Sequence, residues 1–216
     1  MKATYLSFPA GVLIFAPCCA IAATTLPFIQ PVNSAIPDNN GSGLVSVIPV
    51  STGGQTITSV EVTLTTSSGW NGDLYAYLEH NGVISVLLNR PGRTDANPAG
   101  AASSGLTVTL MEAAPLDIHT AISGVSGVSV TGIYQPDARA ADPGVVTETS
   151  PRSLYLSGFT GQIADGKWTL FVADLADGGV STLNNWGISL NVVPEAGAAL
   201  LGGLGLLTLL RRKRDT

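Results

Sequence analysis

Carboxylates and amides gathered in loop-forming segments are the side chains of this sequence with the clearest chemical capacity. They occur beside glycines and asparagines in four short stretches, and the candidate ligands are Asp38, Asp73, Asp95, Asp174 and Asp177. Ca²⁺ takes six to eight oxygen ligands from carboxylates, amides and carbonyls, so these stretches predict calcium ions that brace loops. The alternative is that the same residues only form turns.

Residues that could form a catalytic site are sparse. The sequence holds two histidines, His80 and His119, and a serine triad needs one of them beside an activated serine and an orienting aspartate. His80 directly precedes an Asn-Gly turn, where a solvated polar residue is expected, and no Gly-x-Ser-x-Gly elbow or phosphate loop occurs. Two distant histidines likewise do not make a zinc site. We predict that the chain is not an enzyme.

The segment that must position these residues alternates apolar and polar side chains at the period of a β-strand. Asn81-Gly82 supplies the two positive-φ residues of a type I′ turn between strands at 73–80 and 83–88. Further strands are predicted at 44–50, 57–66, 106–111, 153–156, 167–173 and 186–192, with long surface loops at 90–105 and 136–151. Many short strands without helical periodicity predict an all-β fold, a β-sandwich such as a jelly roll.

The N-terminus has the parts of a secretory signal. Lys2 precedes an apolar run over 6–16, and Ala20-Ile21-Ala22 fits the small-x-small pattern that signal peptidase cleaves. The run is too short for a membrane-spanning helix, which needs roughly 20 residues. We predict a signal peptide helix over 1–23, followed by a linker over 24–35. Both cysteines lie inside the signal, where lipidation is the alternative, so no disulfide supports the mature fold.

The C-terminus carries a second apolar segment. Val193, Pro194 and Glu195 precede an apolar run over 196–210, and a basic end follows with Arg211, Arg212, Lys213 and Arg214. Such a run spans roughly 22 Å as a helix, short of the ~30 Å hydrocarbon core. We predict a weakly inserted transmembrane helix that anchors the protein for a time, with its basic end cytoplasmic. A permanent single-span anchor is the alternative.

A Pro-Glu motif, a short Leu/Gly-rich helix and a basic end together resemble the PEP-CTERM sorting signal of Gram-negative bacteria. The resemblance covers 193–214, within a predicted sorting segment over 193–216. It implies that a membrane-embedded protease, the exosortase, cuts near the motif and releases the protein outward. Ala196 stands where the usual Pro-Glu-Pro has its second proline. This departure bears on the efficiency of cleavage more than on membrane targeting.

Three patterns in the middle of the chain form a second resemblance. They are Ile36-Pro37-Asp38-Asn39, Gly72-Asp73-Leu74, and a closing pattern from Gly166-Lys167-Trp168-Thr169-Leu170 to Trp186. Together they resemble the P domain (P/Homo B domain), which accompanies subtilisin-like proprotein convertases and also occurs alone in bacterial surface proteins. The match covers 36–192 and implies a jelly-roll sandwich with calcium among its loops. Trp168 and Trp186 are expected to pack in its core.

The charge of the segment between the two ends excludes one class of partner. From residue 24 to residue 193, five basic residues stand against thirteen acidic ones, a net charge of −8. Such a domain repels phosphate backbones, so we predict no nucleic-acid binding.

We therefore predict an exported, non-catalytic protein of the cell surface or the exopolysaccharide matrix, first anchored in the inner membrane. Its sandwich is expected to bind a polymer or a protein. One alternative is an accessory P domain that binds and stabilises a secreted subtilisin-like serine endopeptidase. A second alternative is a carbohydrate-binding module that stacks sugars on Trp70, Tyr75 or Tyr77.

Overall fold

The computed structural model describes residues 22–194. The predicted signal helix with Ala20, and the sorting segment from Glu195 through the basic residues 211–214, lie outside this range. None of the described helices is long and apolar enough to cross a bilayer. The elements are β1 (Thr24–Ala35), β2 (Leu44–Val50), β3 (Thr56–Ser67), the 3₁₀ turn η1 (Asn71–Asp73), β4 (Leu74–His80), β5 (Val83–Asn89), β6 (Leu106–Leu110), α1 (Ile118–Ala121), β7 (Val130–Tyr134), η2 (Leu156–Phe159), β8 (Gly166–Asp174) and β9 (Thr182–Val193).

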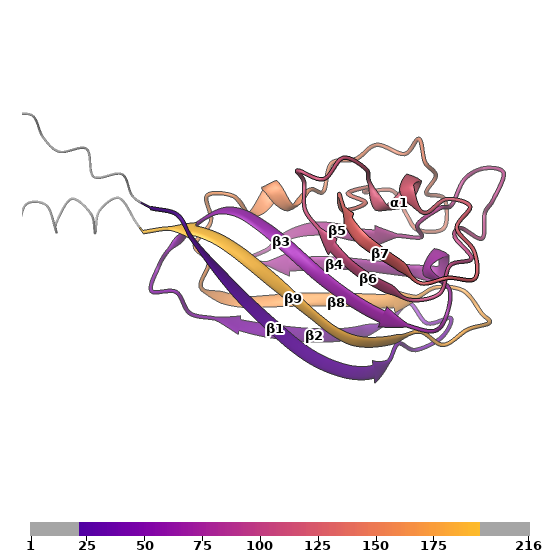
Figure 1. Ribbon diagram of the computed structural model, residues 1–216, viewed down its shortest axis with the longest axis horizontal. Coiled ribbons are helices and arrows are strands. Elements are labelled where there is room, and N and C mark those ends of the chain that lie inside the picture. The colour runs from indigo at the N-terminus through magenta and orange to yellow at the C-terminus, as the bar shows by residue number, and fades with distance from the viewer. Residues whose placement is uncertain (1–21, 195–216) are drawn as a thin grey trace, which may run out of the picture.

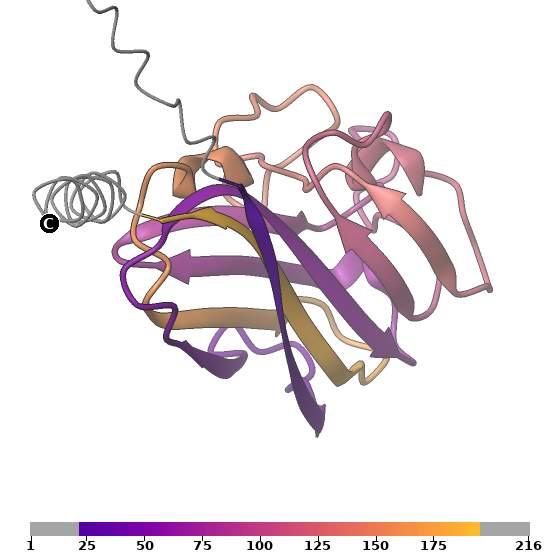
Figure 2. The same cartoon turned by 60° about the vertical axis from the view of Figure 1, so that its left-hand side comes forward.

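Two sheets form the part of the chain that the structure describes, in agreement with the predicted all-β class. The five-stranded sheet has the order β1-β9-β3-β6-β7 and the four-stranded sheet the order β2-β8-β4-β5. Figures 1 and 2 show one sheet lying over the other, with the long loops gathered beside them. Neighbouring strands are antiparallel except for β6 and β7, which are parallel. The hairpin of β4 and β5 turns at Asn81-Gly82 with φ of 48° and 80°, as predicted for a type I′ turn.

Two predicted elements were wrong. Residues 24–35 are not a linker but strand β1, which pairs with β9 from Thr24↔Val192 to Ala35↔Thr182. Its two prolines obscure the strand pattern, but an edge strand tolerates prolines because one row of its N–H groups has no ladder partner. Residues 153–156 form no strand: Arg152 makes an isolated bridge with Arg139, and the 3₁₀ turn η2 begins at Leu156.

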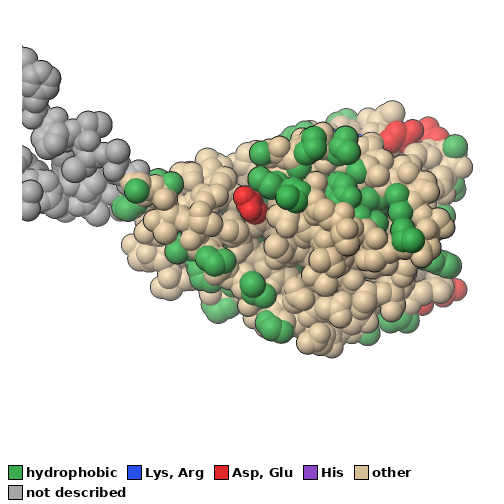
Figure 3. Space-filling view, viewed as in Figure 1, with side chains coloured by type: hydrophobic (Ala, Val, Ile, Leu, Met, Phe, Trp, Pro, Cys, Tyr) green, Lys and Arg blue, Asp and Glu red, His purple; other side chains and the backbone are tan. Residues whose placement is uncertain are grey.

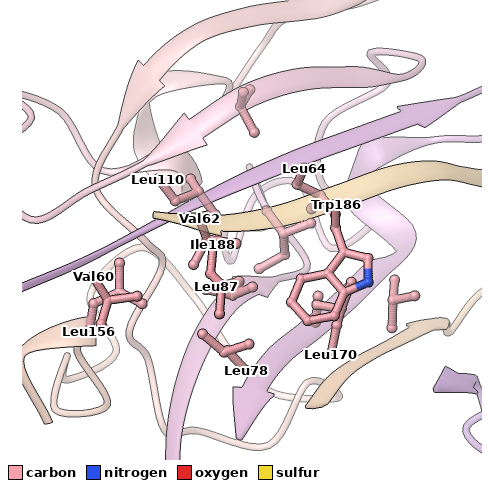
Figure 4. Packing of buried hydrophobic residues seen from close by; sticks show 14 of the residues in the cluster. Val60, Val62, Leu64, Leu78, Leu87, Leu110, Leu156, Leu170, Trp186 and Ile188 are labelled. Atoms are coloured by element: carbon pink, nitrogen blue, oxygen red, sulfur yellow. The ribbon is translucent and has the colours of Figure 1, made fainter. Parts of the chain in front are cut away.

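The core lies between the sheets, where alternate residues of facing strands meet. Trp186 packs from β9 towards Leu64 and Leu170 (Figure 4), and its indole N–H donates to the Ser46 hydroxyl at 2.8 Å. Trp168 is fully buried as well and stacks on His80, with ring centroids 4.1 Å apart. Both tryptophans are therefore core residues, as predicted, whereas the expectation that His80 is solvated was wrong.

The outer face of the five-stranded sheet is mostly uncharged. Figure 3 shows this face with few carboxylates and no lysine or arginine side chains in view. Its strands contribute serine, threonine and asparagine at alternate positions, such as Thr63, Thr65 and Ser189. The face thus lacks the basic stripe that a phosphate backbone would need.

Candidate functional site

Three of the five predicted calcium ligands come together at one end of the sandwich. Asp38 lies in the loop between β1 and β2, Asp73 ends η1, and Asp174 ends β8. Two backbone hydrogen bonds join their segments: the Asn40 amide donates to the Asp174 carbonyl at 2.8 Å, and the Leu175 amide to the Asp73 carbonyl at 2.9 Å. We call Asp38, Asp73 and Asp174 the acidic cluster.

Each carboxylate of the acidic cluster has one buried oxygen without a hydrogen-bond partner: Asp38 Oδ1, Asp73 Oδ2 and Asp174 Oδ2. The pKa of Asp174 is raised to about 6, first by burial and then by the charges of Asp73 and Asp38, against a hydrogen bond from the Ala176 amide. Burial also raises the pKa of Asp73, although Arg90 pairs with its other oxygen at 3.3 Å. Negative charge is therefore concentrated here without full compensation.

The donor chemistry of the acidic cluster fits a hard cation. Buried carboxylate oxygens without partners are costly, and Ca²⁺ prefers such ligands together with backbone carbonyls. Within residues 22–194, however, no three acidic, histidine or cysteine side chains already stand in the arrangement of a metal centre. The fit is thus one of ligand type and of unpartnered oxygens, not of a preformed cage, and the side chains would have to draw closer around an ion.

The other two candidate ligands lie outside the acidic cluster. Asp177 is exposed and borders a hollow of about 280 Å³ that Asp73, Arg90 and Trp70 also line. Asp95 is exposed in a separate hollow, beside Arg93 and facing residues 144–147. The spacing of the aspartates along the chain could not show that Asp95 and Asp177 lie outside the cluster, because their distance from it is set only by the folded structure.

Both histidines are buried, and each of their ring nitrogens has a polar partner within the protein. His80 Nδ1 lies 3.0 Å from the Lys167 carbonyl, and Nε2 lies 2.9 Å from the Ile163 carbonyl and 3.0 Å from the Asn81 side-chain amide nitrogen. His119 Nδ1 bonds to Asp137 at 2.8 Å and Nε2 to the Arg93 carbonyl at 2.8 Å. Neither ring is placed to take a proton from a bound substrate. His119 thus joins α1 to the loop that holds Asp137 and, through the Arg93 carbonyl, to the loop after β5.

Tyr75 and Tyr77 share one face of β4, as predicted, and that face points outward. Their neighbours Leu74, Ala76 and Leu78 fill the core, while both tyrosines are half-buried. Phe171 of β8 joins them, because it pairs directly with Tyr77 across the sheet. We call Tyr75, Tyr77 and Phe171 the aromatic shelf. The third predicted stacking residue, Trp70, is 47% exposed but lies in the hollow next to the acidic cluster instead.

Two parts of this site were not predicted: Phe171, and the wall that the loop 142–144 forms beside the shelf. Alternation in β8 carried a signal for Phe171, since Leu170 and Val172 flank it as core residues. Nothing in the loop itself indicated its position, because only tertiary packing brings it to β4.

Comparison with known proteins gives only distant likenesses. No family model matches the sequence, and no curated protein does. Among solved structures, a serine protease of Aeromonas sobria superposes with a TM-score of 0.44 at 16% identity, over 78% of this chain and 27% of the protease. The same protease in complex with a chaperone gives 0.44 and 16%, over 79% and 27%. The chain thus spans about a quarter of the protein that it matches.

Proposed function

We propose that the chain is an exported, non-catalytic protein whose sandwich binds a partner at the cell surface or in the extracellular matrix. The observation that carries the proposal is the contrast between the side chains that are buried and those that line hollows open to solvent. The two histidines are enclosed, with protein partners at both ring nitrogens. Two open hollows are lined by aromatic residues, small residues and aspartates, with Arg90 in one of them, and no serine, histidine or cysteine is among their lining residues. Casein hydrolysis by the purified chain would contradict this proposal.

The positions of the first and last strands support processing at both ends. β1 begins at Thr24, directly after the predicted signal, and β9 ends at Val193, the first residue of the sorting motif. Thr24 and Val192 are paired, so the chain enters and leaves the sandwich at the same end (Figure 1). Cleavage after Ala22 and near Val193-Pro194-Glu195 would therefore remove no strand.

Mass spectrometry of the protein recovered from culture medium tests the processing. We expect an N-terminus near Ala23 or Thr24 and a C-terminus near Glu195, as signal peptidase and exosortase would leave them. Because Ala196 replaces a proline of the usual motif, a fraction that retains the sorting segment is expected in the membrane. Recovery from the medium of chains that still carry residues 206–214 would contradict release by an exosortase.

A jelly roll of the P/Homo B type is the arrangement that we propose for the sandwich. Its support is the nesting of strand pairs: β1 with β9, β2 with β8, β3 with β6, and β4 with β5. Such nesting is that of one long hairpin rolled into two sheets, which gives the Greek-key connections of a jelly roll. The closing pattern of the resemblance begins in β8 and ends in β9, and its two tryptophans lie in the core.

Calcium in the acidic cluster is part of the same proposal, as a brace for the loops at the end away from the termini. At a calcium concentration about 100-fold above the dissociation constant, the free energy of unfolding is expected to rise by about 2.7 kcal/mol. Differential scanning calorimetry with calcium or with EDTA measures this as a shift of the melting temperature. Asp174→Asn is expected to lose most of the shift, whereas Asp95→Asn, outside the cluster, keeps it.

The calcium effect is expected to depend on pH. Because the pKa of Asp174 is about 6, a proton competes with the ion at pH 5 but not at pH 7.5, and the shift should shrink at the lower pH. Without calcium, Asp174 is expected to change the stability with pH in the opposite direction. A carboxyl whose pKa rises on folding favours the folded state at low pH, and that contribution is lost between about pH 3.8 and 6. Identical melting curves with calcium and EDTA at pH 7.5 would remove calcium from the account.

The second candidate function is an accessory domain for a subtilisin-like endopeptidase encoded elsewhere. The closing pattern from Gly166 to Trp186 favours it, since the resembling domains accompany such proteases. A domain of this kind would act by binding the folded protease and stabilising it by mass action.

A further inference from the structure

We propose that the hollow above the aromatic shelf binds pyranose units of a neutral polysaccharide, an inference that rests on the extracellular location proposed above. The hollow has a volume of about 460 Å³ and lies over β4 and β8, on the outer face of the four-stranded sheet. A volume of this order accommodates a small organic ligand or one to two units of a polymer.

Three aromatic rings in contact with one another form the floor of the hollow. The rings of Tyr77 and Phe171 lie 4.9 Å apart and nearly parallel, at 18°. The Tyr75 ring stands 6.0 Å from Tyr77 and 6.3 Å from Phe171, edge-on to both. Sugar rings present an apolar C–H face, which can pack on the part of these half-buried rings that their mutual stacking leaves exposed.

The shelf is held in place before any ligand arrives. The residues that alternate with it on β4 and β8, such as Leu78 and Val172, are buried in the core. The rings also pack against one another, so each has little rotamer freedom left to lose on binding. Rigid tyrosines of this kind give a large contact area at a low entropic cost.

Polar groups stand at the walls. Asp142, Pro143 and Gly144 form one wall, and Gly41 and Leu175 contribute to the rest of the lining. The Asp142 carboxylate is exposed and accepts from the Gly144 amide at 2.7 Å, which leaves it further lone pairs. Burial raises the pKa of Tyr75 most, Tyr77 raises it next, and the charge of Asp142 raises it further. The carboxylate therefore acts electrostatically on the shelf itself. Carboxylate and tyrosine hydroxyls together can bond the hydroxyls of a sugar.

Charge selects among polysaccharides. Among the residues that line this hollow, Asp142 is charged and no lysine or arginine is present. The domain around it carries thirteen acidic residues against five basic ones between residues 24 and 193. A polyuronate would be repelled, whereas a neutral polymer meets no like charge. A protein partner would need about 800 Å² of matching surface, while the wall confines this site to a hollow.

Affinity electrophoresis of the full chain in mild detergent tests the proposal, with laminarin, dextran or alginate in the gel. We expect at least one of the two neutral polymers to retard the chain and alginate not to. Tyr77→Ala removes the central ring of the shelf and should weaken the apparent affinity about tenfold or more. Tyr77→Phe keeps the ring and should retain most of the affinity. Tyr155→Ala, which removes a half-buried tyrosine ring outside the hollow, should leave the affinity unchanged.

Melting curves of the variants separate binding from folding, because the shelf lies on the surface and its loss should leave the fold intact. Retardation by alginate alone, or by no polymer, would overturn the proposal, as would equal retardation of Tyr77→Ala and the unchanged chain. A larger loss in Tyr155→Ala than in Tyr77→Ala would do the same. If no polysaccharide retards the chain but a secreted protease binds it, the proposal is overturned in favour of the accessory role. None of these outcomes bears on export, which the termini of the mature protein report separately.

Discussion

Replacing Trp186 by alanine is expected to lower the free energy of unfolding by about 3–5 kcal/mol. The side chain is 0% exposed, lies between the two sheets beside Leu64 and Leu170, and bonds to Ser46 of β2. Its loss opens a cavity that both sheets line, and neither sheet can close it without shifting the other. Urea denaturation followed by circular dichroism measures the change.

Two control variants show whether the loss of stability comes from the core packing of Trp186 or from the loss of any tryptophan or of the indole hydrogen bond. Trp70→Ala removes a tryptophan that is 47% exposed, so only about half of its surface is buried and the expected cost is about 1–2 kcal/mol. Ser46→Ala removes only the partner of the indole N–H and should cost about 1 kcal/mol. If Trp70→Ala destabilises the protein as much as Trp186→Ala, the core does not lie where the two sheets face each other.

The second large effect is expected from Asp137→Ala, at about 3–5 kcal/mol. The Asp137 carboxylate is fully buried and contacts His119 Nδ1 at 2.8 Å and Arg139 Nη1 at 3.2 Å. It also accepts from the Asn89 amide at 3.1 Å. Removing it leaves Arg139 with one carboxylate partner, Asp117, and leaves a buried imidazole without its acceptor. Asp95→Ala, which removes an exposed carboxylate, serves as the matched control.

A pH series gives this prediction a second readout. Burial alone would lower the pKa of His119, but its hydrogen bond with Asp137 and the charge of Asp137 raise the pKa above the ordinary 6.5. The pair therefore stabilises the folded state below about pH 6.5, and this contribution is lost as the pH rises through the raised value. In Asp137→Ala burial dominates and the trend should reverse, so that acid destabilises the variant. If the unchanged protein and Asp137→Ala lose stability in parallel as the pH rises, the His119–Asp137 pair does not have this role.

Much of the fold could be predicted because its signals are local. Alternation placed β2 at residues 44–50 and located β3, β4, β5, β6, β8 and β9 to within a few residues. Asn81-Gly82 determined the β4–β5 turn, since both residues adopt positive φ. β1 was missed because Pro27 and Pro31 resemble linker residues, and only its pairing with β9 makes it a strand. β7 was missed because Gly132 interrupts a short segment of five residues.

The candidate sites, like the strands, were predicted where the signal is local and missed where it depends on tertiary contacts. The sequence by itself determined which residues have binding chemistry: five loop aspartates, and two tyrosines on one face of a strand. Side-chain type and the two-residue period are local properties, so no partner strand was needed. Only the tertiary structure decided that Asp38, Asp73 and Asp174 meet while Asp95 does not, that His80 is buried, and that Phe171 and the loop 142–144 complete a hollow around the tyrosines. These are contacts between segments far apart in the chain, and the register and packing of two sheets create them.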